Sequence, residues 1–398
     1  MPPVLAGLLG NRNRNARTRI PPEIGRTRFS AFPTAMPEAP SRCSTPVLHS
    51  QARLMENTTM KTRYYLPVAA AFLVLAPAIA QAGQTFDAVK DRDLVRCGTP
   101  QGTVGFGYPD DSGSFIGMNP DFCHAFAAAT LGDASKAEMV SLTSQTRFPA
   151  LQTGEIDVLI SNTTNTLTRD ATLGINFGAT NFYDGQGMMV PKSLAISSAT
   201  ELDGATVCVQ PGTTTELNLN DYFLANNMTF NPLVIESVAE VREAFFSGRC
   251  DVYSTDSSLL AAARVASPAP DDFMILPERI SKEPLAPLVR QGDDEWLDIV
   301  SWTIYATMQA EEYGINQANV DDFLDSDDPA IRRFLGVEPG LGEALGVDDK
   351  FAYNVVKQVG NYADIYNRWV GPDTALELDR GLNELWTNGG LLYNPPFR

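Results

Sequence analysis

The sequence predicts an α/β protein of two lobes, each built on a mainly parallel sheet flanked by helices, with a helical C-terminal extension. From Gln84 onwards, short β-branched runs alternate with helical patterns, as they do in proteins with parallel sheets. A helix–glycine–strand pattern occurs twice, and the chain after residue 289 has mostly helical periodicity. With 398 residues, 44% of them hydrophobic, the chain is long enough to form several buried cores.

The N-terminal segments have the composition of a targeting sequence. Residues 60–82 contain a short basic start, an apolar stretch and the small-x-small sequence Ala80-Gln81-Ala82, which predict a cleaved secretory signal peptide, with a retained anchor as the alternative. Residues 1–59 are either a disordered leader or lie upstream of a true translation start at Met60, which is the interpretation we prefer. No cysteine follows the cleavage site, so we expect no lipid anchor.

The elements expected in the first lobe follow the signal peptide. They are a strand over 93–98, a helix over 119–131, a helix over 147–153 closed by Gly154, and a strand over 157–161. In the helix over 119–131, Phe122, Ala125, Phe126 and Ala129 fall on one face.

The second lobe repeats this pattern in register. A helix over 238–247 is closed by Gly248 and followed by a strand from Asp251, with the spacing that separates Gly154 from Asp157. Each of the two strands ends in a polar cluster. The clusters are Asn162-Thr163-Thr164 and Thr255-Asp256-Ser257. Because ligands bind beyond the carboxyl ends of strands in open α/β sheets, we expect one ligand between two facing lobes.

Two short, extended, proline-marked segments, 188–191 and 284–289, are expected to connect the lobes. They predict a discontinuous first lobe, 84–190 plus 287–398, and a second lobe over 191–286.

The composition argues against several classes of function. The chain has 48 Asp+Glu against 30 Lys+Arg, a net charge of −18, which is unsuited to nucleic acid and gives no support to anionic membranes as partners. Its two histidines, His49 and His124, have no metal-ligand spacing around them, so we expect neither a metal nor a cofactor.

Arg169, just after the first cluster, is a candidate for binding a carboxylate, because its planar guanidinium can donate two parallel hydrogen bonds. A surface ion pair with Asp170 is the alternative. Thr213 and Thr214 open a glycine-led helix whose free N–H groups favour an anion. Here the alternative is a capping box of Thr213 with Glu216.

Asp256, at the end of the second-lobe strand, offers a carboxylate to an ammonium group, and a helix N-cap is its alternative role. Together with Arg169 and the helix start at Thr213, it matches the head group of a free α-amino acid. We expect no other basic residue to lie near the polar clusters and Arg169. We therefore expect Arg169→Ala to abolish amino-acid binding and leave the fold intact.

Five stretches resemble the periplasmic substrate-binding proteins of ABC transporters for general or polar L-amino acids. They are Asp157-Val…Thr168-Arg-Asp170, Tyr183-Asp-Gly-Gln-Gly187, Val207-Cys-Val-Gln-Pro-Gly-Thr-Thr-Thr-Glu216, Gly248-Arg-Cys-Asp-Val-Tyr-Ser-Thr-Asp256 and the tail from Arg380. The resemblance covers 84–398. It implies the type II periplasmic-binding-protein fold, capture of several polar or acidic L-amino acids by hinge closure, and delivery to an inner-membrane permease by a periplasmic monomer.

The resemblance also implies a role for each candidate. Arg169 would clamp the substrate carboxylate, aided by N–H and hydroxyl groups of Thr213 and Thr214. Asp256 would bind the ammonium group with help from the first cluster. The members of that cluster are Asn162, Thr163 and Thr164.

Two further positions bear on the substrate's side chain. Phe106 would face that side chain, with ordinary core packing as the alternative. Asn165 departs from the pattern, since relatives commonly have Trp there, and this leaves the side-chain preference open.

Export places four cysteines in an oxidising compartment, and an even number suggests disulfides. Cys97 can pair with Cys123, and Cys208 with Cys250, which keeps each bridge within one lobe. Four cysteines allow three connectivities, and buried free thiols are a further alternative. The fifth, Cys43, falls in the leader.

Two alternative functions remain open on the same fold. One is a periplasmic dehydratase, for which Glu216 is the nearest general acid and His124 a weaker candidate for a base. The other is a ligand-sensing partner of a receptor, which the sequence does not separate from a transport protein.

Overall fold

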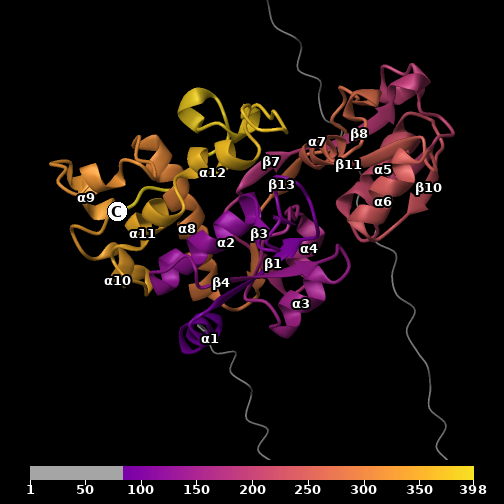
Figure 1. Cartoon of the computed structure of the whole chain (residues 1–398). Coiled ribbons are helices and arrows are strands. Elements are labelled where there is room, and N and C mark those ends of the chain that lie inside the picture. Colours follow the sequence, from indigo (N-terminus) through magenta and orange to yellow (C-terminus); the bar gives the residue numbers. More distant parts are fainter. Residues whose placement is uncertain (1–83) are drawn as a thin grey trace, which may run out of the picture. The chain divides into compact units, whose positions relative to one another are not determined.

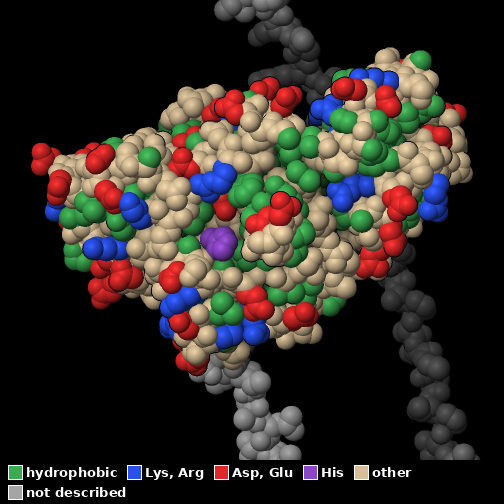
Figure 2. Space-filling model, viewed as in Figure 1, with side chains coloured by type: hydrophobic (Ala, Val, Ile, Leu, Met, Phe, Trp, Pro, Cys, Tyr) green, Lys and Arg blue, Asp and Glu red, His purple; other side chains and the backbone are tan. Residues whose placement is uncertain are grey.

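The computed structural model describes residues 84–398, which Figure 1 shows with their helices and strands labelled. The leader over 1–59, the signal peptide over 60–82, His49 and Cys43 lie outside the described residues. Within 84–398, none of the helices combines the length and apolar character that crossing a bilayer requires. On the face shown in Figure 2, acidic and basic side chains are interspersed around apolar areas.

The first lobe is built on a five-stranded sheet in the order β4-β1-β5-β14-β6. Its strands are β1 (Val95–Pro100), β4 (Ala137–Leu142), β5 (Val158–Leu159), β6 (Ile175–Phe177) and β14 (Leu288–Arg290). β1 pairs in parallel with β4 and β5, whereas β14 runs antiparallel between β5 and β6. The helices of this part are α1 (Gln84–Arg92), α2 (Met118–Leu131), α3 (Arg147–Thr153) and α4 (Leu167–Thr172). α2 packs on β1 and β4, as the apolar face of the predicted helix requires. A short hairpin, β2 (Tyr108–Pro109) and β3 (Phe115–Ile116), precedes it.

The second lobe is built on a sheet in the order β10-β9-β11-β8-β12. Its strands are β8 (Gln186–Pro191), β9 (Thr206–Val209), β10 (Asn231–Val234), β11 (Val252–Asp256) and β12 (Phe273–Ile275). Its helices are α5 (Thr214–Ala225), α6 (Val238–Phe246) and α7 (Ser257–Val265). Alternate residues of β9 face opposite sides, because successive side chains of a strand do so. Val207 packs with Phe223 of α5, and Cys208 packs with Phe245 of α6.

Two antiparallel strands, β7 (Phe182–Asp184) and β13 (Glu283–Leu285), join the lobes, with Asp184 opposite Glu283. We call this pair the hinge. The expected first connection at 188–191 is wrong, because those residues belong to β8 and pair with β11 and β12 inside the second sheet. Pro191 ends a strand there. The second expected connection, 284–289, overlaps β13 but continues into β14 of the first sheet.

The repeated pattern has one structural cause in both lobes. Gly154 and Gly248 follow α3 and α6 with φ of 80° and 76°, a conformation that glycine adopts without strain. Asp157 then exchanges two hydrogen bonds with the backbone of Arg96, at 2.9 Å from its N–H and 2.8 Å to its carboxylate. Asp251 exchanges the same two bonds, with the same lengths, with Thr206. The aspartates therefore align each strand with its neighbour.

The C-terminal extension is helical, as predicted. Its helices are α8 (Asp294–Glu312), α9 (Pro329–Phe334), α10 (Leu341–Leu345), α11 (Phe351–Gln358) and α12 (Tyr362–Trp369). The predicted apolar face of α8, which includes Trp296 and Ile304, is fully buried in the core of the first lobe. Tyr362 of α12 is also buried, and its hydroxyl donates a 2.9 Å hydrogen bond to the carbonyl of Asn181, just before the hinge. The extension thus supports the base of the hinge.

Both expected disulfides are present. Cys97 of β1 is bonded to Cys123 of α2, and Cys208 of β9 is bonded to Cys250, just before β11. The Cα–Cα distances are 6.0 Å and 5.8 Å, within the ordinary range for disulfides. Each bridge stays within one lobe, so neither restricts movement at the hinge.

Candidate functional site

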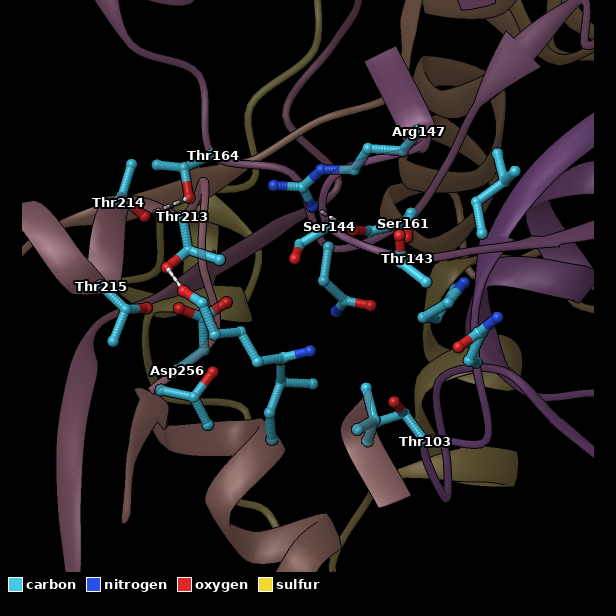
Figure 3. A pocket seen from close by; sticks show the side chains of 18 of the residues that line it. Thr103, Thr143, Ser144, Arg147, Ser161, Thr164, Thr213, Thr214, Thr215 and Asp256 are labelled. Atoms are coloured by element: carbon cyan, nitrogen blue, oxygen red, sulfur yellow. Dashed lines mark hydrogen bonds between the residues drawn. The ribbon is translucent and has the colours of Figure 1, made fainter. Parts of the chain in front are cut away.

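A pocket lined by residues of both lobes lies beyond the carboxyl ends of the strands (Figure 3). We call it the ligand pocket. The first-lobe side chains include Ser144, Arg147, Asn162, Thr164 and Arg169, and the second-lobe side chains include Gln210, Thr213, Thr214, Thr215 and Asp256. Six of the eight candidates from the sequence therefore meet here. They are Asn162, Thr164, Arg169, Thr213, Thr214 and Asp256.

Arg169 is held in the pocket by the start of α4. Thr166 caps this helix by accepting the N–H of Arg169, and the arginine side chain is 8% exposed. Its Nη1 donates a 2.9 Å hydrogen bond to the carbonyl of Thr164, and its guanidinium lies over the Phe148 ring. No ion pair to Asp170 is found among the described residues, so the surface-pair alternative does not hold.

Arg147, the first residue of α3, is a second cation that the sequence analysis missed. It is 7% exposed, and its Nη1 donates at 3.2 Å to both the carbonyl of Ser161 and the hydroxyl of Thr163. Its Nε is buried without a hydrogen-bond partner in the described part of the chain. Burial, followed by repulsion from Arg169, lowers the pKa of Arg147 to about 9. The expectation that Arg169 has no basic neighbour is therefore wrong.

Asp256 ends β11 and faces the pocket with a side chain that is 5% exposed. It precedes α7 in the N-cap position, but its carboxylate makes no capping bond, so the N-cap alternative fails for the side chain. No hydrogen bond to this carboxylate is found among residues 84–398. Burial raises the pKa of Asp256 well above its usual range, and the nearby carboxylates of Asp184 and Glu283 add to the effect.

The start of α5 has one capped backbone N–H group and two N–H groups that have no partner among the described residues. Thr213 accepts the N–H of Glu216 at 3.3 Å, so the cap alternative is correct for its hydroxyl. Thr214 and Thr215, the first two helical residues, have N–H groups that cannot bond within the helix. In the described chain no partner for these two groups is found, which leaves them able to bind an anion.

The remaining candidates have different surroundings. Asn162 lines the pocket in the left-handed conformation, with φ of 44°, and its side chain accepts a 2.8 Å hydrogen bond from Asn119. Thr163 is fully buried behind the pocket, where it bonds to Arg147. Phe106 is 1% exposed and packs edge-on against Phe182, with 5.5 Å between ring centroids. It lies in the core and outside the lining of the ligand pocket, so core packing is the role that the structure gives it.

Asn165 also lies outside the ligand pocket. Its N–H donates a 2.9 Å hydrogen bond to the carbonyl of Pro284, and the residue borders a separate cavity beside the hinge. The departure from Trp at this position therefore does not act directly on the ligand pocket.

Direct contacts hold the two lobes together at the rim of the pocket. Ser144 donates a 2.9 Å hydrogen bond to the carbonyl of Pro211, and Thr143 donates a 2.6 Å hydrogen bond to Glu236. Both bonds join a loop of the first lobe to the second. The structure therefore represents a closed arrangement of the lobes.

The candidates for acid–base chemistry lie elsewhere. Glu216 does not line the ligand pocket, and its carboxylate accepts the N–H of Gly212 at 3.3 Å, which is a capping contact. His124 lies on α2 with Nδ1 2.7 Å from the carbonyl of Ala134. Among the described residues, no group of three or more His, Cys, Asp or Glu side chains is arranged to hold a metal ion.

Comparison with known proteins agrees with this geometry. Residues 95–318 match the family model of bacterial extracellular solute-binding proteins, family 3. The chain is 50% identical, over 85% of its length and 100% of the relative, to the general L-amino acid-binding periplasmic protein AapJ of Rhizobium johnstonii. It is also 50% identical, over 85% of its length and 99% of the relative, to the glutamate/glutamine/aspartate/asparagine-binding protein BztA of Rhodobacter capsulatus.

A solved structure gives the same result. A periplasmic binding protein of an ABC transporter from Brucella ovis, with glutathione bound, has a TM-score of 0.78 and 48% identity. The match covers 79% of this chain and 99% of that one. The type II fold expected from the resemblance is confirmed. The chain belongs to the bacterial extracellular solute-binding proteins of family 3.

Proposed function

We propose that this protein captures free L-amino acids, with a preference for acidic ones, by closing its two lobes around them. The observation that carries the proposal is the charge of the ligand pocket. Two buried arginines from the first lobe and one buried carboxylate from the second line the same space. Buried charges need partners, and an amino acid between the lobes supplies them.

Each part of the head group has a matching site. Arg169, together with the N–H groups of Thr214 and Thr215, suits the α-carboxylate, because a guanidinium and a helix start both favour an anion. Asp256 suits the α-ammonium group, because its carboxylate has no hydrogen-bond donor among the described residues. Contacts from both lobes stabilise only the closed form, so the ligand shifts the equilibrium towards closure.

Arg147 carries the preference for acidic side chains. Arg169 and Asp256 already match the two charges of the zwitterionic head group, so Arg147 is the one charged side chain of the pocket lining, among the described residues, that the head group leaves without a counter-charge. Glutamate or aspartate supplies a second carboxylate that compensates this charge, whereas glutamine or asparagine does not. The relative BztA is named for binding all four of these amino acids, which supports the substrate class.

The setting of the activity follows from the family. We propose that the chain works as a monomer in the periplasm after cleavage of its signal peptide and passes its ligand to an inner-membrane ABC permease. AapJ is named as a periplasmic amino-acid-binding protein, and the solved relative as an ABC transporter/periplasmic binding protein. The relatives are named as binding proteins, and neither Glu216 nor His124 faces the ligand pocket. We therefore propose that the protein is not an enzyme.

A screen of the twenty L-amino acids against residues 83–398, refolded to remove carried-over ligand, tests the proposal. Thermal shift identifies ligands, and calorimetry measures their dissociation constants. A ligand at 100 times its dissociation constant stabilises the native state by about 2.7 kcal/mol. We expect the largest shifts with glutamate and aspartate. A flat response to all twenty would reject the proposal, and equal affinities for glutamate and glutamine would reject the preference.

A further inference from the structure

Glu283, on the hinge strand β13, lies directly behind the ligand pocket and was not singled out from the sequence. Its side chain is 2% exposed. Among the described residues its carboxylate takes part in no ion pair, and four hydrogen bonds to it are found. The donors are the hydroxyls of Thr164, Thr214 and Ser281 and the side-chain amide of Asn218.

These donors come from both lobes. Thr164 belongs to the first lobe, and Thr214 belongs to α5 of the second. Both hydroxyls donate to the same carboxylate atom, Oε2, and their own oxygens lie 3.4 Å apart. The other atom, Oε1, accepts from Asn218 at 2.9 Å and from Ser281. One carboxylate on the hinge therefore joins the two lobes through two residues that also line the pocket.

The carboxylate also fixes the direction of these hydroxyls. A hydroxyl has one proton to donate, and an ionised carboxylate can only accept. With both protons directed at Glu283, Thr164 and Thr214 have only lone pairs left for a ligand. Lone pairs accept from an ammonium group and repel a carboxylate. The resemblance implied that the hydroxyl of Thr214 assists carboxylate binding. This arrangement favours the opposite for the hydroxyl, whereas the N–H of Thr214 can still bind a carboxylate.

We propose that Glu283 is a positioning residue for the ligand's ammonium group: it holds the hydroxyls of Thr164 and Thr214 as hydrogen-bond acceptors and completes this arrangement only when the lobes are closed. The inference rests on the proposed function. Opening the lobes must separate the carboxylate from at least one of the two hydroxyls, because they belong to different lobes. Ammonium binding and closure are thereby coupled through one side chain.

Glu283→Gln tests the inference, because glutamine has the same shape but presents an NH₂ donor in place of one carboxylate oxygen. Calorimetry would compare L-glutamate with glutarate, which has both carboxylates and lacks the ammonium group. We expect Glu283→Gln to weaken glutamate binding at least tenfold and glutarate binding less than threefold. Glu240→Gln, an exposed change on α6 away from the pocket, should alter neither.

A double-mutant cycle with Thr214→Val gives an independent measure, which also serves if glutarate binds too weakly to quantify. The two losses in glutamate affinity should be less than additive, because either change breaks the same contact. If circular dichroism shows that Glu283→Gln is unfolded, Glu283→Asp replaces it. That variant keeps the charge, withdraws the carboxylate from the hydroxyls, and should lose at least threefold.

The outcomes separate this inference from the proposed function. If the unmodified protein binds no amino acid, the proposed function fails and the inference fails with it. If the unmodified protein binds glutamate, the inference alone is overturned by additive losses in the cycle. An equal loss for glutamate and glutarate, which indicates a merely structural role, also overturns it.

Discussion

Arg147 and Arg169 reach the same pocket from two different helices, and both guanidinium groups lie over the ring of Phe148, at 4.9 Å and 5.3 Å from its centroid. Like charges at this proximity repel each other, and burial adds to the cost. The aromatic ring and the carboxylate of Asp256 offset part of it. The side chains that line the pocket therefore include two cations and one carboxylate, an arrangement that favours an anionic ligand.

Arg169→Ala should abolish measurable amino-acid binding and leave the fold intact. Removing one partner of a desolvated charge pair costs about 3 kcal/mol or more, which corresponds to at least a hundredfold in affinity. Calorimetry with L-glutamate measures the loss, and circular dichroism checks the fold. Arg249→Ala removes an exposed arginine outside the ligand pocket and should bind normally. Retained micromolar affinity in Arg169→Ala would remove this residue from the carboxylate role.

Arg147→Met should change specificity more than overall affinity. The thioether fills part of the volume and removes the charge, so glutamate should lose at least tenfold while glutamine loses less than threefold. The ratio of the two dissociation constants is the measurement. A matching loss for both ligands would show that Arg147 supports the loop at Ser161 and Thr163 and does not meet the side-chain carboxylate.

Asp256→Asn should stabilise the ligand-free protein at neutral pH. The pKa of Asp256 is higher in the folded than in the unfolded chain, so the folded state binds more protons. The free energy of unfolding therefore falls as pH rises from about 4 through the folded pKa. Asparagine removes this loss, and the variant's advantage in melting temperature should disappear as pH approaches 4.

The same variant should bind glutamate more weakly, though less so than Arg169→Ala, since the amide keeps a hydrogen-bonding oxygen but loses the charge. Calorimetry at pH 7.5 compares the two. Unchanged affinity would refute the ammonium assignment, and a melting temperature below that of the unmodified protein at pH 7.5 would refute the stability argument.

Replacing Cys208 and Cys250 with serine should lower stability but leave binding in place. The bridge spans 42 residues, for which loop entropy predicts about 4 kcal/mol, or a fall in melting temperature of roughly 6 °C. Both cysteines belong to the second lobe, so the hinge and pocket are unaffected. Calorimetric scanning and glutamate titration at 15 °C give the two values, and loss of binding in a folded variant would contradict the prediction.

Several local features were predictable because neighbours along the chain create them. Gly154 and Gly248 end helices, and Asp157 and Asp251 each exchange two hydrogen bonds with the neighbouring strand. Because the glycine and the aspartate are equally spaced in both cases, the sequence predicted two related lobes. The polar clusters could be placed at strand ends because they directly follow the apolar residues of each strand in the sequence. Arg169 could be found because it lies on the helix that follows its cluster.

The position of the hinge could be predicted less accurately than these local features. Proline and an extended pattern mark strand ends as often as connections, and only the hydrogen-bond partners of β8 place 188–191 inside a sheet. The resemblance implied that Phe106 faces the substrate side chain, with core packing as the alternative. The sequence does not separate the two roles, because an aromatic residue beside a loop looks the same whether it faces a pocket or packs on Phe182.

The sequence by itself determined the repeated pattern of the two lobes, and it supplied the four cysteines and most of the candidate pocket residues without fixing how the cysteines pair. Only the tertiary structure decided the rest of the pocket. Arg147 precedes the first cluster, and Glu283 meets Thr164 across 119 residues of chain. Both residues act through their charge in a buried pocket. That pocket forms only when the two lobes, connected by β7 and β13, come together. Residue type and spacing record local geometry, whereas burial and long-range pairing depend on the closed fold.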